Sequence, residues 1–436
     1  MKTKLLHLWD GLQTSFWFIP LLIMLIAIGA SFGLIYLDNI LDYQPEGFME
    51  FFVSGGAESA RSILATIAGA MLGVAGTVFS ITLVALTLAS SQFGSRLLRN
   101  FMHDRINQVV LGAYTATFMY CLLVLRTVKS YDDIEFVPNL SVIFAILVAI
   151  ANIFLLIIFI HHISLSIQAD YVINDVVKHL HKSIRKLFPE ELGEETDRES
   201  EQLAMELKEK REVQDVIKTD EDGYLQAIDN EGLMQAAQEH NLLIALKHRP
   251  GVYLVKNMEL LRLYAESEIS EKTRKRISKA FIYGDKRTPT QDAEFAIHQL
   301  AEIASRALSP GINDPYTAIS CIDKLTATMC YLTHAHFPSA YRYDENKKLR
   351  IITRPLNFQG MMDAAFNQIR QFGKDSPSVL IRLMEAFATI NHYSRTQEQQ
   401  DCVSRHAKMV YRIAKESLTE PNDLEDLKER LRKIRS

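Results

Sequence analysis

Four long segments without a charged side chain constrain the fold of this chain more than any other feature of its sequence. They cover residues 11–37, 62–95, 106–125 and 136–169. A span of a bilayer needs about 20 apolar residues at a helical rise of 1.5 Å, so each segment is long enough. The first is longer than a signal-peptide core and has no small-residue cleavage site directly behind it. We therefore predict a transmembrane domain over residues 1–170, with spans at about 12–37, 62–92, 107–126 and 138–162.

The charges that flank these segments predict which side each connection faces, because cytoplasmic connections retain Lys and Arg. Basic residues precede the first segment, join the second to the third and follow the fourth: Lys2, Lys4, Arg96, Arg99, Arg105, Lys178, Lys182, Arg185 and Lys186. The other two connections are mainly acidic, with Asp38, Asp42, Glu46, Glu50 and Glu58 in one and Asp132, Asp133 and Glu135 in the other. We therefore expect a multi-pass protein with both termini in the cytoplasm.

The second span is over-long and carries a stripe of small and hydroxyl side chains at helical spacing. Its members are Ala65, Gly69, Gly73, Gly76, Ser80, Thr87 and Ser91. One interpretation is a packing seam, in which Gly69 and Gly73 let a neighbouring helix approach closely. The other is that the stripe from Gly69 to Ser91 lines a water-filled path in a symmetric oligomer. Proton pumps and voltage sensors need charges at membrane depth, and the spans contain none, so only a passive path or an inert anchor fits.

Two further polar features lie in the fourth span. Asn152 is near its middle, where an amide needs a partner on another helix, so we predict an interhelical hydrogen bond there. His161 and His162 stand at its cytoplasmic end, where a solvated interfacial pair and a pH or metal role are both open.

The remainder of the chain is predicted to be a cytoplasmic α+β domain, which makes the whole protein mainly α. Residues 171–215 form a charged helical stalk, broken near 189–193. Residues 216–266 read as strands 224–228, 242–246 and 252–264 with a helix at 231–240, a small half-barrel of the lipoyl type. The flanks of Lys256 do not match the hairpin that carries a biotin or lipoyl group, so no such modification is predicted and the cofactor stays unknown. Residues 267–436 read as mainly helical, with a hairpin at 341–353.

One helix is predicted to begin at Thr288, because an N-cap hydroxyl is followed by Pro289 and by Gln291 three residues after the cap. Within it, Glu294, His298 and Glu302 follow each other at i, i+4 spacing. Such a set could hold a divalent metal or act in acid-base chemistry. The alternative is an exposed face stabilised by side-chain pairing, which the sequence favours.

The most distinctive segment is a tight corner between two helices at residues 306–318. Pro310 and Gly311 suit the centre of a type II turn, and Asp314 followed by Pro315 suits the start of a new helix. The corner could present polar groups to an anion, a metal or a partner subunit, or it could be purely structural. The candidate binding residues are Arg306, Ser309, Asn313 and Asp314.

Other classes of function lack support in the sequence. The formal net charge is −4 without a long block of one sign, which argues against nucleic acid as a partner. The four cysteines, Cys121, Cys321, Cys330 and Cys402, have neither zinc spacing nor a paired framework. No nucleophile elbow, phosphate loop or zincin motif occurs. We therefore predict that the protein is not an enzyme.

The chain resembles the bacterial membrane family catalogued as domain of unknown function 2254. The resemblance rests on residues 77–86 (TVFSITLVAL) and 89–93 (ASSQF), on 223–229 (GYLQAID), on Arg287-Thr288 with Gln291-Asp292, and above all on 306–315 (RALSPGINDP). It covers nearly the whole chain and implies a bacterial inner (plasma) membrane location, but no particular activity. His298 departs from the family pattern, which weakens the metal hypothesis.

Two functions remain open at this stage. The first is a homo-oligomeric pore or channel, lined by the second span and controlled by a cytoplasmic regulatory domain. The second is a membrane-anchored cytoplasmic module that binds a ligand or metal as a sensor or scaffold, without transport. The expected partners are the lipid bilayer and further copies of the chain.

Overall fold

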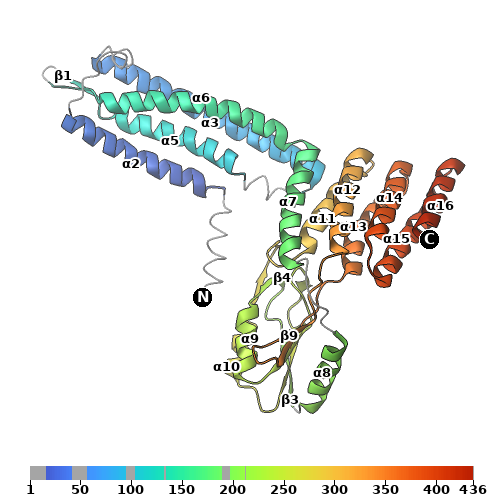
Figure 1. Ribbon diagram of the computed structural model, residues 1–436. Helices are drawn as coiled ribbons and strands as arrows, with labels where there is room; N and C mark the ends of the chain where they lie inside the picture. Colours follow the sequence, from blue (N-terminus) through green and yellow to red (C-terminus); the bar gives the residue numbers. More distant parts are fainter. Residues whose placement is uncertain are drawn as a thin grey trace. The chain divides into compact units, whose positions relative to one another are not determined.

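The computed structural model describes residues 16–41, 56–94, 104–131, 134–188, 197–211 and 213–435. The chain divides into two compact units, Met1–Tyr171 and Val172–Ser436, which are described separately. The first holds the apolar helices, and the second mixes helices and strands (Figure 1).

Four apolar helices make up most of the first unit, as predicted. They are α2 (Phe18–Leu41), α3 (Gly56–Phe93), α5 (Arg105–Leu125) and α6 (Asn139–Ser166). Each is long and apolar enough to cross a membrane. A short antiparallel hairpin of β1 (Lys129–Tyr131) and β2 (Ile134–Phe136) lies between α5 and α6. Helix α3 is continuous over 38 residues, which corresponds to about 57 Å at 1.5 Å per residue.

The most enclosed of these helices is α5, which packs against α2, α3 and α6. Its Gly112 allows a close approach of α2: a Cβ atom there would lie 2.9 Å from the Cα of Pro20. Small residues at helix interfaces in membranes have this role. Among the glycines of this unit whose surroundings the structure describes, the closest contact is therefore on α5.

Polar side chains join the helices inside the first unit. The Asn152 amide on α6 donates to the Thr117 hydroxyl at 2.9 Å and contacts the sulfur of Met71 at 3.4 Å. The Tyr114 hydroxyl donates to the carbonyl of Asn152 at 2.6 Å. The predicted interhelical role of Asn152 is confirmed, since it links α6 to both α5 and α3.

Asp38 departs from its predicted place in a solvated loop. Helix α2 continues past it to Leu41, and the carboxylate is buried at the amino end of α6. There it accepts hydrogen bonds from the backbone amides of Leu140 and Ser141. Because α2 ends one turn later than predicted, Asp38 lies within this helix and caps the amino end of α6.

The second unit begins with two helices, α7 (Ala169–Leu187), whose first turn precedes the division, and α8 (Asp197–Lys210). Helix α7 is amphipathic, with a buried apolar face that includes Ile173 and Leu180. Both helices lie in the region 171–215 that the sequence assigned to a charged helical stalk, and the expected break near 189–193 falls outside the described residues.

The strands of the second unit form two sheets rather than one small half-barrel, so the lipoyl-like fold is not confirmed. The first sheet has the order β3 (Val213–Lys218), β7 (Glu259–Ala265), β5 (Leu243–Leu246), β10 (Leu349–Ile352) and β9 (Tyr341–Tyr343). The second has the order β6 (Tyr253–Leu254), β4 (Gly223–Ile228) and β8 (Phe281–Gly284). Among the strands that the structure describes, only β10 and β5 pair in parallel.

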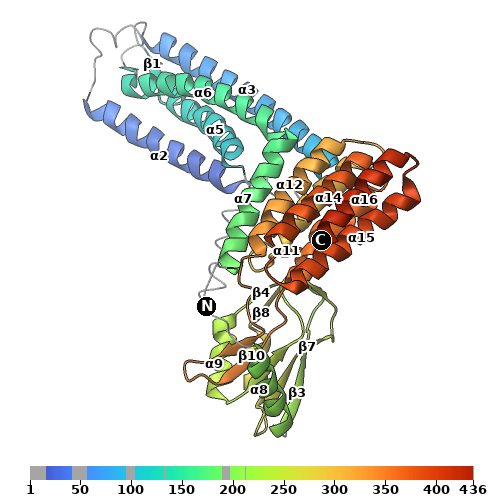
Figure 2. The ribbon, with the colours of Figure 1, turned by 45° about the vertical axis from the view of Figure 1, so that its right-hand side comes forward.

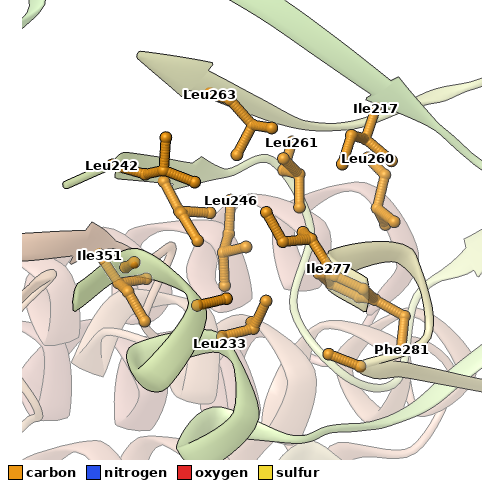
Figure 3. Close-up of a cluster of buried hydrophobic side chains, with 14 of the residues drawn as sticks. Ile217, Leu233, Leu242, Leu246, Leu260, Leu261, Leu263, Ile277, Phe281 and Ile351 are labelled. Carbon is orange, nitrogen blue, oxygen red and sulfur yellow. The ribbon is translucent and has the colours of Figure 1, made fainter. Parts of the chain in front are cut away.

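Three of these strands, β8, β9 and β10, come from the region that the sequence assigned to a helical domain. They join the sheets because their apolar residues complete a shared core. Ile351 of β10 pairs with Ile244 of β5, and both are buried. Figure 3 shows Ile351 and Phe281 in one cluster with Leu233 of α9 (Asn230–Glu239). Helix α10 (Glu271–Ser278) adds Ile277 to the same cluster.

A set of six helices completes the second unit (Figure 2). They are α11 (Glu294–Ala307), α12 (Pro315–Leu332), α13 (Phe358–Phe372), α14 (Pro377–Tyr393), α15 (Gln397–Ser417) and α16 (Pro421–Arg435). In their core, Phe366 of α13 and Phe387 of α14 meet edge to face at 5.2 Å between ring centroids.

The prediction of a helix from Thr288 was wrong, because α11 begins only at Glu294. The side chain of Gln291 accepts from the amide of Ile228 and donates to its carbonyl, both at 3.0 Å. Asp292 is held by the guanidinium of Arg287 at 2.7 Å. The segment before α11 is therefore fixed to β4 by side-chain bonds that a cap at Thr288 would not allow.

Candidate functional site

The small-residue face of α3 points away from the rest of the first unit. A Cβ atom at Gly69, Gly73 or Gly76 would meet nothing within 4 Å, and Ser80 is exposed. Thr87 and Ser91 are also exposed. The opposite face of α3 carries the buried residues, among them Leu64, Ala68, Ala75, Val78, Ala85 and Ala89. Among the described helices of this chain, none covers the six residues that the sequence singled out.

The hydroxyl groups on this face bond to their own helix. Thr77 donates to the carbonyl of Gly73 at 3.2 Å, Thr87 to that of Leu83 at 2.9 Å, and Ser91 to that of Leu88 at 2.8 Å. Each hydroxyl proton is thus satisfied in an apolar environment, while the oxygen keeps lone pairs on the outward side. The face can contact lipid, another helix or a hydrated ion without a change of rotamer.

A polar cluster at the end of α6 fixes the start of α5. The carboxylate of Asp104 caps α5 by accepting from the amide of Ile106 at 2.9 Å, and it also contacts Nε2 of His162. The hydroxyl of Ser166 lies 3.3 Å from the same nitrogen. In an acid-base relay the two partners use different ring nitrogens. The cluster therefore joins two helices and does not have the geometry of a catalytic triad.

The corner at residues 306–315 is built largely from its own hydrogen bonds. Asp314 caps α12 as predicted, accepting from the Thr317 amide at 3.1 Å and from its hydroxyl at 2.5 Å. Ser309 donates from its hydroxyl to the carbonyl of Arg306 at 2.6 Å, and Arg306 lies 3.7 Å from Glu302. Of the four candidate residues, only Asn313 has a side chain without a bond in the described part of the chain.

The predicted type II turn at Pro310 and Gly311 was wrong. A type II turn requires positive φ at its third residue, and Gly311 does not have it. The left-handed residue is Asn313, with φ 50°. Asparagine tolerates this conformation better than most residues, which explains how the chain reverses before Asp314.

The three candidate metal ligands on α11 are not brought together as a site. Both carboxylate oxygens of Glu294 lie 2.9 Å from Nη2 of Arg249, and Glu302 pairs with Arg306. His298 has an interaction of its own. Within the parts of the chain that the structure describes, no three His, Cys, Asp or Glu side chains are arranged to hold a metal ion.

The structure adds a cavity that sequence reasoning missed. It has a volume of about 390 Å³ and is lined by Arg249, Thr353, Arg354, Pro355, Leu356, Asn357 and Gly360. Arg249 follows β5, whereas the other residues connect β10 to the first turn of α13. These segments are distant in the sequence and meet because β10 pairs with β5. In the sequence, Arg249-Pro250-Gly251 between two predicted strands is typical of a turn and does not indicate a cavity.

A buried acid supports the Arg249 side of this cavity. Asp292 packs against Gly251 and pairs with Arg287. Burial raises the pKa of Asp292, while Arg287 opposes the shift. The turn that positions Arg249 is therefore fixed by a buried ion pair behind it.

Comparisons with known proteins found mycobacterial relatives and a family model. Two mycobacterial relatives, the uncharacterized proteins Mb1321c of Mycobacterium bovis and Rv1290c of Mycobacterium tuberculosis, are each 29% identical over 419 residues. The match covers 95% of this chain and 79% of each relative. No solved structure matches the chain significantly. A family model described as "Predicted membrane protein (DUF2254)" matches residues 13–389, and the chain belongs to this family.

Proposed function

We propose that this membrane protein self-associates through the small-residue face of α3 and forms a passive pore in the bacterial inner membrane. The observation that carries the proposal is the position of Gly69, Gly73, Gly76, Ser80, Thr87 and Ser91 on the outside of the single chain. In a ring of identical chains, the same face of each copy surrounds a common axis.

The character of the other exposed surfaces supports this choice. Helices α2 and α6 expose large apolar side chains, such as Phe32 and Phe154, which suit contact with lipid. The outward face of α3 also exposes apolar side chains such as Leu83 and Val84, but its glycines and hydroxyls lower the apolar area that it offers to lipid. Small residues let helices approach, and hydroxyl oxygens can replace water around an ion. The glycines and hydroxyls therefore suit contact with a helix of another copy or with water, and the larger side chains between them suit an apolar contact.

We further propose that the termini and the second unit lie in the cytoplasm, where the second unit regulates the path. The support is the alternation of basic and acidic connections along the sequence. On this proposal the bilayer and further copies are the partners, and the protein has neither a catalytic role nor a nucleic-acid partner. A reporter fused after Ser436 tests the orientation, since a periplasmic reporter would contradict it.

Disulfide cross-linking tests the self-association. In a background without the four native cysteines, Ser80→Cys should give covalent dimers on mild oxidation in membranes. Ile157→Cys, on an exposed apolar position of α6, is the matched control and should stay monomeric. If both variants cross-link equally, or if neither does, α3 does not form the interface between copies.

Electrical recording tests the pore itself. The purified protein in planar bilayers should conduct with little dependence on voltage, because the described parts of α2, α3, α5 and α6 lack a charged stripe that could sense it. Thr87→Leu should lower the conductance, because the larger apolar side chain narrows the path and excludes water from it. If the protein forms cross-linked oligomers but the bilayers show no conductance, the pore proposal is wrong. The proposed interface through α3 would then still hold.

A further inference from the structure

The cavity beside α13 is lined by two arginine side chains, and the neighbouring carboxylates do not neutralise both of them. Arg249 uses only Nη2 for its contacts with Glu294, and its other guanidinium nitrogens make no hydrogen bond within the described residues. Arg354 is exposed and makes no ion pair there. The lining thus contains two guanidinium groups, of which only Arg249 is paired with a carboxylate, and this leaves a net charge of about +1 at the cavity.

The backbone at the same place also favours an anion. Asn357 caps α13 by accepting from the amide of Gly360 at 2.9 Å, and both residues line the cavity. The first amides of a helix have no acceptor within it and point out of its end, where the helix dipole favours negative charge. The cap satisfies the amide of Gly360, and an oxygen of Glu294 lies 3.9 Å from the position of a Cβ atom there. The amides of Phe358 and Gln359 are therefore the ones left without a hydrogen bond in the described residues.

From this arrangement we propose that the cavity binds the phosphate group of a small phosphorylated molecule. A planar guanidinium matches phosphate oxygens in pairs, and a helix amino end is a common phosphate site. A cation is disfavoured, because both oxygens of Glu294 already face Arg249 and the carboxylate of Asp292 is paired with Arg287.

The size and walls of the cavity indicate a ligand larger than phosphate alone. A volume of about 390 Å³ exceeds what a single phosphate fills and falls within the range of small-molecule pockets. Pro355 and Leu356 give it an apolar wall, which suits the organic part of a phosphate ester.

Binding here would join two parts of the second unit. Arg249 belongs to the sheet region, whereas Gly360 belongs to α13 of the helical region. A ligand that contacts both would stabilise their mutual arrangement. A soluble ligand bound at this site could therefore regulate the second unit. This inference does not depend on whether α3 lines a pore.

A binding titration of the full-length protein in detergent tests the proposal. The probes are inorganic phosphate, glycerol 3-phosphate and adenosine monophosphate, with sulfate and chloride at equal ionic strength as controls. Thermal stabilisation and calorimetry should show saturable binding of the phosphate esters, tighter than that of inorganic phosphate or sulfate. Arg354→Ala should weaken it at least tenfold, Arg354→Lys less so.

The matched control is Arg412→Ala, which removes an exposed arginine of α15 outside the cavity lining and should leave binding unchanged. Short-chain phosphatidic acid distinguishes a lipid source from a soluble one: binding of this probe alone, lost in Arg354→Ala, would assign the site to a lipid phosphate. Equal binding by wild type and Arg354→Ala, or equal effects of chloride and phosphate, would overturn the site. None of these readouts depends on conductance.

Discussion

The carboxylate of Asp38 accepts a hydrogen bond from the Ser141 hydroxyl at 2.6 Å, joining the end of α2 to the start of α6. The same carboxylate accepts from the amides of Leu140 and Ser141 at 2.8 and 3.0 Å. It therefore performs the function of an N-cap from a different helix, where the unsatisfied amides of α6 and its dipole favour a negative charge.

Replacing this carboxylate should destabilise the first unit. Asp38→Asn keeps the shape but removes the charge and one acceptor oxygen, so we expect a loss of about 1–3 kcal/mol, as for a buried charge-assisted bond. Thermal unfolding in detergent measures the change. Glu58→Gln, at an exposed position of α3, is the control and should have little effect. Equal stability of the two variants would show that Asp38 does not support α6.

The apolar helices could be predicted from the sequence because their signal is local. A run of uncharged residues longer than a bilayer needs is sufficient to define each one, and strand β4 and helix α9 follow from equally local patterns. The position of Asp38 was missed for the opposite reason. Its role depends on residues 140 and 141, and nothing near it in the sequence indicates them.

The cavity could not be predicted from the sequence, for the same physical reason. Its residues converge only after Ile351 pairs with Ile244, a contact between strands that are remote along the chain. The start of α11 was missed because the Gln291 side chain bonds to Ile228, which outweighs the local capping signal. Predictions from local propensity fail where a side chain forms its hydrogen bonds with backbone groups that are distant in the sequence.

Acid should destabilise the second unit through His406. This side chain is 1% exposed, and its Nε2 lies 3.1 Å from Oδ1 of Asp363 without the alignment of a hydrogen bond. Burial lowers the pKa of His406 to about 4; Arg405 and Arg370 add to the shift and Asp363 opposes it. The folded protein therefore binds fewer protons than the unfolded chain between that value and an ordinary pKa of about 6.5.

The direction of the effect follows from this difference. The stabilisation from a neutral His406 is complete above about pH 6.5 and is lost as the pH falls toward about 4, by at most about 3 kcal/mol. Thermal unfolding between pH 7 and pH 4.5 should show a steeper decline for wild type than for His406→Leu. Parallel declines would mean that other groups, and not His406, cause the acid sensitivity.

A pair of glycines provides a test of the turns in the second unit. Gly251 has φ +97°, and a Cβ atom there would lie 2.5 Å from Oδ2 of Asp292. Gly251→Ala should therefore cost more than about 1 kcal/mol, through backbone strain and displacement of the buried carboxylate. Gly311 has ordinary φ and nothing within 4 Å, so Gly311→Ala should change the stability by only a few tenths of a kcal/mol. Unfolding temperatures of the two variants decide the comparison.

Two glycines of the first unit separate folding of the chain from its association. At Gly112 a larger side chain meets the backbone of Pro20, so Gly112→Leu should misplace α2 and destabilise the single chain by about 1–3 kcal/mol or more. At Gly73 nothing lies within 4 Å, so Gly73→Leu should leave the single chain as stable as wild type. If α3 forms the interface between copies, Gly73→Leu should nevertheless reduce the oligomer fraction in size-exclusion chromatography with light scattering. A normal oligomer in Gly73→Leu would place the contact on another surface, because a leucine cannot be accommodated where two glycine faces meet closely.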